Sequence, residues 1–168
     1  MNIQDLRLLY DYHYWAKHHL LSFCKKLTHA QLIAPNTFSN GNLKATLVHL
    51  MSAEWIWLQR CRDGVSPPAM LNDADYPTLT DVIKRWDDEE AQFQTWLSTL
   101  SDSDLQGNAS YISPIGGAFT NTLWHILTHV ITHGMQHNSE VAQMLTDFGH
   151  SPGNIDLIVY LRSYRAAK

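Results

Sequence analysis

The chain has 168 residues, a formal net charge of −4 at neutral pH and ten histidines. This length predicts one domain, residues 1–168, with a substantial core. The absence of a Lys/Arg cluster excludes the electrostatic footprint of a nucleic-acid partner. Neither a signal sequence nor a bilayer-spanning apolar run is evident, so we expect a cytoplasmic protein without membrane contact. Cys24 and Cys61 lack CxxC spacing and are interpreted as reduced core thiols.

The amino-terminal part of the chain predicts two long helices. The first covers about 3–27 and carries His13 among its inward-facing apolar residues. The turn-rich stretch 34–42 ends in Asn-Gly-Asn, which can cap the next helix. That helix, about 43–62, is apolar almost all round, as expected of a helix buried in a bundle.

A long connection precedes the third predicted helix. Segment 63–79 contains three prolines and an Asp-Gly pair, which is typical of a crossover in a helical bundle. The helix then begins at Thr80 or Asp81 and ends near residue 100. Its acidic run, 87–90, is interpreted as a solvated face and not as a site.

The carboxy-terminal part predicts one more long helix and a short one. Segment 101–120 is expected to be a connection, and Thr120 or Asn121 to cap a helix that ends near 148–149. A short helix over 155–165 closes the chain. Because few stretches alternate as strands do, the predicted class is all-α. The expected architecture is a four-helix bundle with a long crossover connection and a short fifth, C-terminal helix.

Four histidines at four-residue intervals dominate the last long helix: His125, His129, His133 and His137. Each step rotates the side chain by about 40° and raises it by about 6 Å, so one ion can take only an adjacent pair. The apolar residues that share one face are Leu123, Ile126, Leu127, Val130, Val141, Met144 and Leu145. His133 and His137 lie at or within the edge of this face, which makes them the predicted metal ligands. Gly134 lies mid-face, where a neighbouring helix can approach closely.

The roles of the other two histidines of this helix, and the identity of a third metal ligand, are predicted less directly. His125 points away from the apolar face and is expected at the surface, whereas His129 is expected beside the ligands. By periodicity alone, His49 and His13 are equally good candidates for a third ligand, since each lies in an apolar helix. His13, His129 and Glu140 are thus interpreted as residues that support the ligands or replace one of them.

Several short segments, in their order and spacing, resemble one known family over essentially the whole chain. They are Tyr14-Trp15-Ala16, Leu47-Val48-His49-Leu50 with Ala53-Glu54-Trp55, Gly116-Gly117 before Leu123-Trp124, the stretch from His129 to His137, and Gly149 through Asp156 to Tyr160. Together they are similar to the DinB-like (damage-inducible) family of the DinB/bacillithiol-transferase (YfiT-like) superfamily. The resemblance implies a four-helix bundle, a metal triad of His49, His133 and His137, and a homodimer.

Two positions depart from the family pattern. The chain has Asn138-Ser139-Glu140 where the family usually has Arg-Gly-Gln after its last histidine, and Lys17 where it often has Asn. These positions are expected to border the pocket, so the substrate does not follow from the resemblance.

Three neutral imidazoles leave a coordination position open, as in catalytic metal sites. The resemblance therefore suggests a metal-dependent hydrolase or thiol S-transferase that acts on a small molecule, with a low-molecular-weight thiol as the expected co-substrate of a transferase. Zinc or nickel is the expected metal, although imidazoles also suit iron, copper or manganese. His133 and His137 have the HExxH pair spacing, but Gly134 replaces the glutamate, which argues against a peptidase.

The sequence does not decide which residue acts as general base, or whether the protein is an enzyme. Glu140 or Glu54 could activate water, yet each is as well explained as a surface or bundle residue. The alternative to an enzyme is a non-enzymatic, stress-associated helical dimer with a structural or adventitious metal. In that case a fourth protein ligand would close the site, and His13 is the first candidate.

Overall fold

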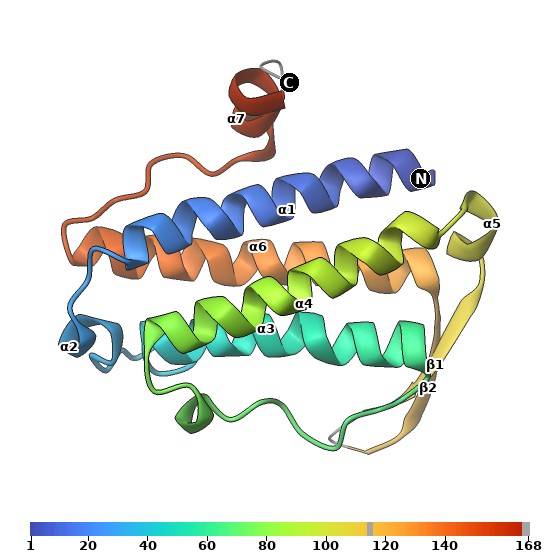
Figure 1. Cartoon of the computed structure of the whole chain (residues 1–168), viewed down its shortest axis with the longest axis horizontal. Coiled ribbons are helices and arrows are strands. Elements are labelled where there is room, and N and C mark those ends of the chain that lie inside the picture. The colour runs from blue at the N-terminus through green and yellow to red at the C-terminus, as the bar shows by residue number, and fades with distance from the viewer. Residues whose placement is uncertain (114–115, 166–168) are drawn as a thin grey trace.

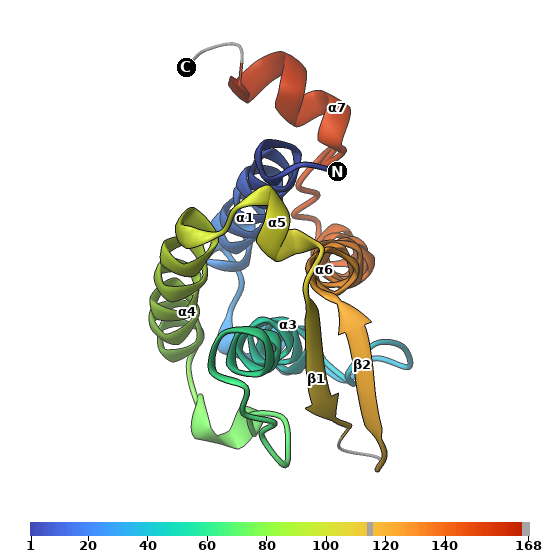
Figure 2. The ribbon, with the colours of Figure 1, turned by 90° about the vertical axis from the view of Figure 1, so that its right-hand side faces the viewer.

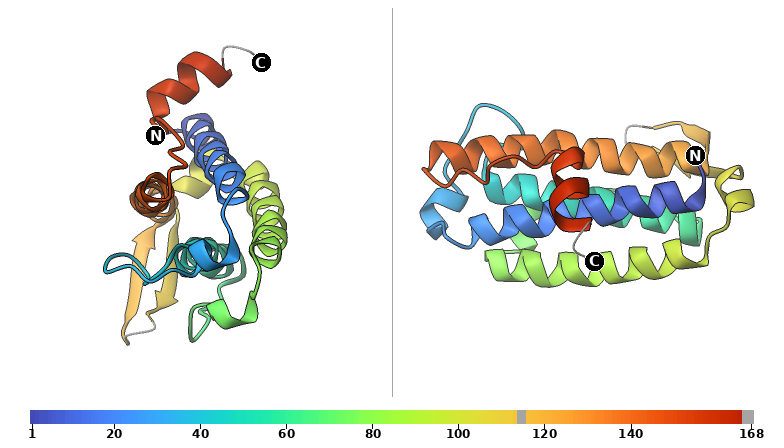
Figure 3. Two further views of the ribbon diagram at one scale, coloured as in Figure 1. Left: turned by 90° about the vertical axis from the view of Figure 1, so that its left-hand side faces the viewer. Right: turned by 90° about the horizontal axis from the view of Figure 1, so that it is seen from above.

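The computed structural model describes residues 1–113 and 116–165 and is mostly helical (Figure 1). Its four long helices lie side by side: α1 (Ile3–Cys24), α3 (Leu43–Leu58), α4 (Leu79–Thr99) and α6 (Leu123–Asp147). The view from above in Figure 3 shows them running along the long axis of the molecule. Helix α6 packs against α1 and α3, and α4 packs chiefly against α3. The helical class predicted from the sequence is therefore right in outline.

Local capping explains where the long helices begin. At the start of α1, the Asn2 side chain accepts from the Asp5 amide and the Asp5 side chain accepts from the Asn2 amide, which together form a capping box. Thr78 and Asp81 form a second capping box before α4. Asn42 caps α3 by accepting from the Ala45 amide at 2.8 Å, as its sequence context predicts. Helix α3 continues as a π-helical turn, Gln59–Asp63, which ends at Gly64 in the left-handed region (φ 68°).

The segment predicted as a plain connection, 101–120, contains a β-hairpin, which corrects the all-α prediction. Strand β1 (Asn108–Ile112) pairs antiparallel with β2 (Ala118–Thr122), with Tyr111 opposite Phe119. Gly116 and Gly117 take φ angles of 96° and 94°, which a residue with a side chain rarely adopts. Helix α6 consequently begins at Leu123, and neither Thr120 nor Asn121 caps it, because both belong to β2. Strands of five residues are too short to be recognised from the alternation of apolar and polar residues.

Short helices were also missed. Helix α2 (His29–Leu32) and α5 (Asp102–Leu105) are single turns, each with a capping box at its start. The terminal helix is α7 (Leu157–Tyr160), continued by a π-helical turn, Leu161–Arg165, and it lies across α1 outside the main body (Figure 2). The Tyr12 hydroxyl of α1 donates to the carbonyl of Ile155 at 2.8 Å and fixes this segment.

The acidic run 87–90 on α4 is not a uniformly solvated face. Asp87 and Glu90 accept hydrogen bonds from the Lys17 ammonium at 2.9 and 2.8 Å, and this lysine is only 1 % exposed. Glu89 is buried and pairs with Arg85 one turn earlier. Four consecutive helical residues span a full turn, so at least one of them must face the interior.

The core lies between the four long helices as two apolar clusters, one centred on Met51 and Trp86 and the other on Tyr10, Phe93 and Leu127. Cys24 and Cys61 are free thiols; Cys24 lies in the core, as predicted, whereas Cys61 is only partly buried. Burial raises the pKa of each to about 12. Neither is therefore a nucleophile at neutral pH. Within the described residues, no helix is long and apolar enough to cross a membrane.

Candidate metal centre

Helices α3 and α6 bring three histidines to one point. His133 and His137 lie one turn apart on α6, and His49 projects from the middle of α3. One nitrogen of each ring lies within 4.8 Å of one nitrogen of the other two. The apolar face of α6 is buried where its periodicity placed it, so the histidine pair at its edge faces α3. The structure thus assembles the three residues that the resemblance implied as a triad.

The spacing of the nitrogens fits a metal ion. His49 Nε2 and His133 Nε2 are 3.2 Å apart. Two imidazole nitrogens bound at 2.0–2.1 Å in tetrahedral geometry would be separated by about 3.3 Å. The His137 ring lies close to both others, with centroid distances of 4.7 Å to His49 and 4.6 Å to His133. Three imidazole nitrogens at this spacing could hold a transition-metal ion.

Glu140 positions the third ligand. Its Oε2 accepts a hydrogen bond from His137 Nδ1 at 2.6 Å, which leaves Nε2 of that ring free to bind an ion. The same oxygen accepts from the Ser39 hydroxyl at 2.5 Å. Ser39 lies before α3 in the left-handed region, with φ 55°, and its hydroxyl is 2.9 Å from Thr46 Oγ1. These hydrogen bonds connect the loop before α3 to His137. The sequence does not predict this role for Ser39, because Ser39 lies outside any helical or strand pattern.

The surroundings of His49 and His133 lower the pKa of both imidazoles. Burial, followed by the neighbouring rings His137 and His49, lowers the pKa of His133 to about 4. Burial also lowers the pKa of His49, with a further contribution from His137. For Glu140, burial raises the pKa, but hydrogen bonds from Ser39 and His137 outweigh it and the net shift is downward. At neutral pH the lowered pKa values favour neutral imidazoles at His49 and His133, and the lowered pKa of Glu140 favours its carboxylate, forms that suit metal binding.

His13 and Glu54, two candidates from the sequence, pair with each other instead of joining the triad. His13 Nε2 lies 2.8 Å from Glu54 Oε1, and both side chains are 2 % exposed. The His13 ring packs on Gly134, where an added Cβ would lie 2.3 Å from Cε1 of the ring. The close helix approach predicted at Gly134 is thus confirmed. His13 is held by the core and supplies no ligand to the cluster.

The other predicted residues lie near the cluster but outside it. His129 is largely exposed, and its ring centroid is 5.6 Å from that of His133. His125 is exposed, as its angular position predicts. Lys17, expected to border the pocket, instead binds Asp87 and Glu90 on α4. Its Nζ atom lies over the Trp86 ring, 5.1 Å from the ring centroid.

No fourth ligand closes the triad in residues 1–113 and 116–165, because no further His, Cys, Asp or Glu joins the group. A second cluster of such groups, His18, Asp87 and Glu90, is exposed or half-exposed. The Lys17 ammonium already pairs with both of its carboxylates, so the cluster does not resemble a cation site.

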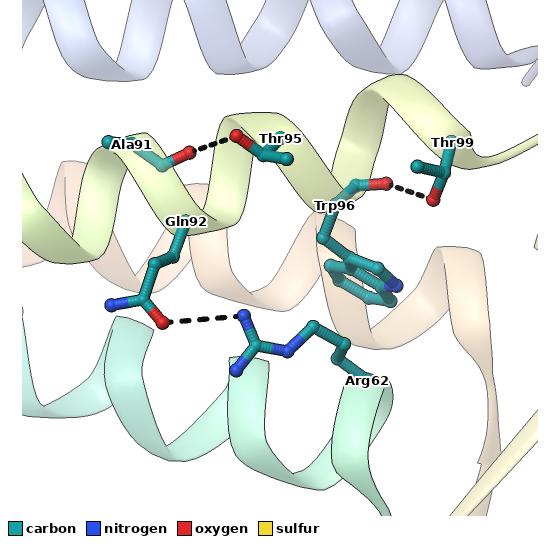
Figure 4. Close-up of a pocket in the computed structure, with 6 residues that line it drawn as sticks. All are labelled: Arg62, Ala91, Gln92, Thr95, Trp96 and Thr99. Atoms are coloured by element: carbon teal, nitrogen blue, oxygen red, sulfur yellow. Dashed lines mark hydrogen bonds between the residues drawn. The ribbon is translucent and has the colours of Figure 1, made fainter.

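Among the cavities lined by the described residues, two lie beside the C-terminal part of α3 and the turn that follows it. One, of about 410 Å³, lies between the end of α3 and the outer face of α4 and is lined by Arg62, Ala91, Gln92, Thr95, Trp96 and Thr99 (Figure 4). Its polar groups are already used: Arg62 binds Asp63 and Gln92, and the two threonine hydroxyls donate to carbonyls of their own helix. The other, of about 220 Å³, is lined in part by His129, whose ring centroid is 5.6 Å from that of His133.

The fold and the site define a mostly helical protein with a cluster of three histidines suited to a metal ion. The family model of the DinB family matches residues 1–167. The chain therefore belongs to the DinB family, as its sequence motifs predict. No curated protein matches the chain.

Proposed function

We propose that His49, His133 and His137 bind one divalent transition metal and that the chain is a metal-dependent enzyme acting on a small molecule. The observation that carries the proposal is the cluster of three imidazoles with no fourth protein ligand among the described residues. Closed four-ligand sites are typical of structural metals, whereas three ligands leave room for a reactant. Zinc and nickel are the expected ions, and iron, copper and manganese also accept imidazole.

Between the two candidate reactions, thiol S-transfer fits the residues better than hydrolysis. A metal bound by the triad would supply Lewis acidity and lower the pKa of a water or a thiol. Hydrolysis also benefits from a general base, yet Glu140 is held by His137 and Ser39, and Glu54 is buried against His13. A thiol needs no such base, since its proton is lost to solvent when the thiolate forms. A sulfur–carbon bond to the electrophile then forms as the bond to the leaving group breaks.

The proposal includes the surroundings of the site. Helices α1, α3, α4 and α6 are taken to form a four-helix bundle that positions the triad. The expected partners are a low-molecular-weight thiol, a small electrophile and a second copy of the chain in a homodimer. A cytoplasmic location is consistent with the two free thiols, and a stress-associated role is part of the proposal.

The test compares metal-loaded protein in two assays. One follows the loss of free thiol on reaction with an electrophile, and the other follows acid release from a small ester. We expect thiol loss that His133→Ala abolishes and that His29→Ala, at an exposed histidine of α2 outside both the triad and the cavities, leaves unchanged. Ester cleavage with the same dependence would assign the hydrolase. Equal background rates for all three proteins in both assays would favour the non-enzymatic dimer.

A further inference from the structure

A cavity of about 220 Å³ opens between α3, α6 and the hairpin, next to the triad. It is lined by Trp57, Tyr111, Asn121, His125, Ile126 and His129. His129 precedes His133 by one helical turn, so the cavity begins about 6 Å from the triad along α6. Rings connect the two places: the His129 ring contacts Trp57 at 5.5 Å and His133 at 5.6 Å between centroids.

The hairpin supplies an aromatic wall that is held rigidly. Tyr111 of β1 meets Trp57 edge to face, at 4.9 Å and 79°. The Arg60 guanidinium lies 4.7 Å from the Trp57 ring and 4.9 Å from the Tyr111 ring, and donates to the Ile112 carbonyl at 3.2 Å. The Tyr111 hydroxyl donates to Asn121 Oδ1 across the strands at 3.0 Å. Figure 2 shows the hairpin standing beside α3 and α6 at this end of the molecule.

The chemistry of the lining selects a planar, uncharged or anionic aromatic group. Trp57, Tyr111 and His129 offer ring faces and edges, which bind another ring in offset or edge-to-face geometry. No carboxylate lines the cavity, and the buried Arg60 cation lies against two of its rings, so a positive ligand is disfavoured. A dry cavity of about 150 Å³ holds benzene, and this cavity is therefore large enough for one or two fused rings.

We propose that this cavity binds the aromatic part of the electrophilic substrate and holds its reacting atom beside the triad. This proposal rests on the proposed function, because the bound group is a substrate only if the chain is an enzyme. The binding site itself requires no metal, because none of the three triad histidines lines the cavity. This separation makes the two proposals testable apart.

The experiment measures the binding of three matched probes to the full chain by ligand-observed NMR and calorimetry, with and without bound metal. The probes are 2-naphthol, its saturated analogue decahydro-2-naphthol, and the cation 2-naphthylmethylammonium. We expect 2-naphthol to bind at least 10-fold more tightly than either of the other two, with metal removal changing its affinity less than 3-fold. Equal affinity for all three probes would overturn the proposal.

Variants locate the binding. His125→Trp adds a ring at the exposed rim of the cavity, and we expect it to weaken 2-naphthol binding at least 10-fold. Thr132→Trp, at an exposed position of α6 outside the lining, is the matched control and should bind as wild type does. Trp57→Ala should weaken binding similarly, whereas Trp96→Ala, in the other cavity, should not. Unchanged binding in His125→Trp would place the probe elsewhere and overturn the proposal, even if Trp57→Ala fails to fold.

The two proposals fail differently. If 2-naphthol binds as expected but no thiol or ester reaction depends on His133, the aromatic binding site is supported and the proposed enzyme function is contradicted. If the reaction depends on His133 but His125→Trp leaves its KM for naphthyl and for methyl electrophiles unchanged, the enzyme stands and the cavity is not its substrate site.

Discussion

Two of the histidine–glutamate pairs among the described residues, His13–Glu54 and His137–Glu140, have opposite consequences. His13 and Glu54 meet at 2.8 Å between α1 and α3, and His137 and Glu140 meet at 2.6 Å within α6. The first pair is 2 % exposed, and its histidine ring packs on Gly134. The second keeps 12 % and 25 % of its side chains exposed, and its histidine faces two further imidazoles.

The difference lies in what surrounds the second ring nitrogen. His13 Nδ1 and Glu54 Oε2 find no hydrogen-bond partner among the described residues and are covered by the core. The other ring nitrogen of His137 lies near the nitrogens of His49 and His133, so the Glu140 carboxylate orients an imidazole of the candidate metal site. A histidine–carboxylate contact alone therefore does not identify a site. The convergence of several imidazoles on one point does.

The largest effect is expected from breaking the buried pair. His13→Leu leaves the Glu54 carboxylate buried without its partner, which should lower the free energy of unfolding by about 3–5 kcal/mol. Urea unfolding followed by circular dichroism measures the loss. The double variant His13→Leu, Glu54→Leu should recover most of the stability. A loss below about 1 kcal/mol in the single variant would mean that the pair is not an ionic contact of the core.

Glu140→Gln tests the second pair. The amide is a weaker acceptor for His137 Nδ1 than the carboxylate, so metal affinity should fall by about 10–100-fold with little change in stability. Competition with a chromogenic chelator gives the affinity. Asp147→Asn, which changes an exposed carboxylate on the same helix, is the control and should bind metal as wild type does. Equal affinities in the two variants would remove Glu140 from the site.

Gly134→Ala separates packing from ligation. The added methyl group would meet the His13 ring, and the resulting strain of about 1–3 kcal/mol exceeds the helix-propensity gain of about 1 kcal/mol. We expect a net loss of up to about 2 kcal/mol by urea unfolding, and near-normal metal content. Combining Gly134→Ala with His13→Ala should relieve the strain. Stabilisation by Gly134→Ala alone would contradict the close contact.

The smallest effect is a pH dependence of the metal-free protein. The pKa of His133 is about 4 in the fold and about 6.5 when unfolded, so the unfolded chain binds more protons between these values. Stability should therefore fall as pH decreases through this window. Allowing for solvent screening of a half-buried ring, we expect a loss of about 1 kcal/mol from pH 7 to pH 5. His133→Gln should reduce this slope, and an unchanged slope would assign it to other groups.

The sequence predicts the parts of the site that a single helix determines. His133 and His137 follow from the apolar period of α6, and Gly134 from its position on the same face. Periodicity cannot choose between His49 and His13, because both are in buried helices and the choice depends on how α1, α3 and α6 pack. The family resemblance points to His49, and the structure shows that His13 is engaged by Glu54.

The parts that the sequence does not reveal depend on contacts between distant segments. Ser39 reaches Glu140 across 101 positions of the chain, and Arg60 organises the hairpin from the end of α3. The hairpin itself has strands of five residues, and its aromatic wall exists only once Tyr111 meets Trp57. Lys17 could not be placed either, since its partners are on α4.

Metal content measured by elemental mass spectrometry tests the central claim most directly. Untagged wild-type protein is compared with His49→Ala, His133→Ala and the control His125→Ala, each after incubation with zinc or nickel. The triad predicts about one equivalent in the wild type and the control, and none in the other two variants. Metal retained by His49→Ala but lost from His133→Ala would move the third ligand elsewhere, and a wild type without metal would contradict the metal site altogether.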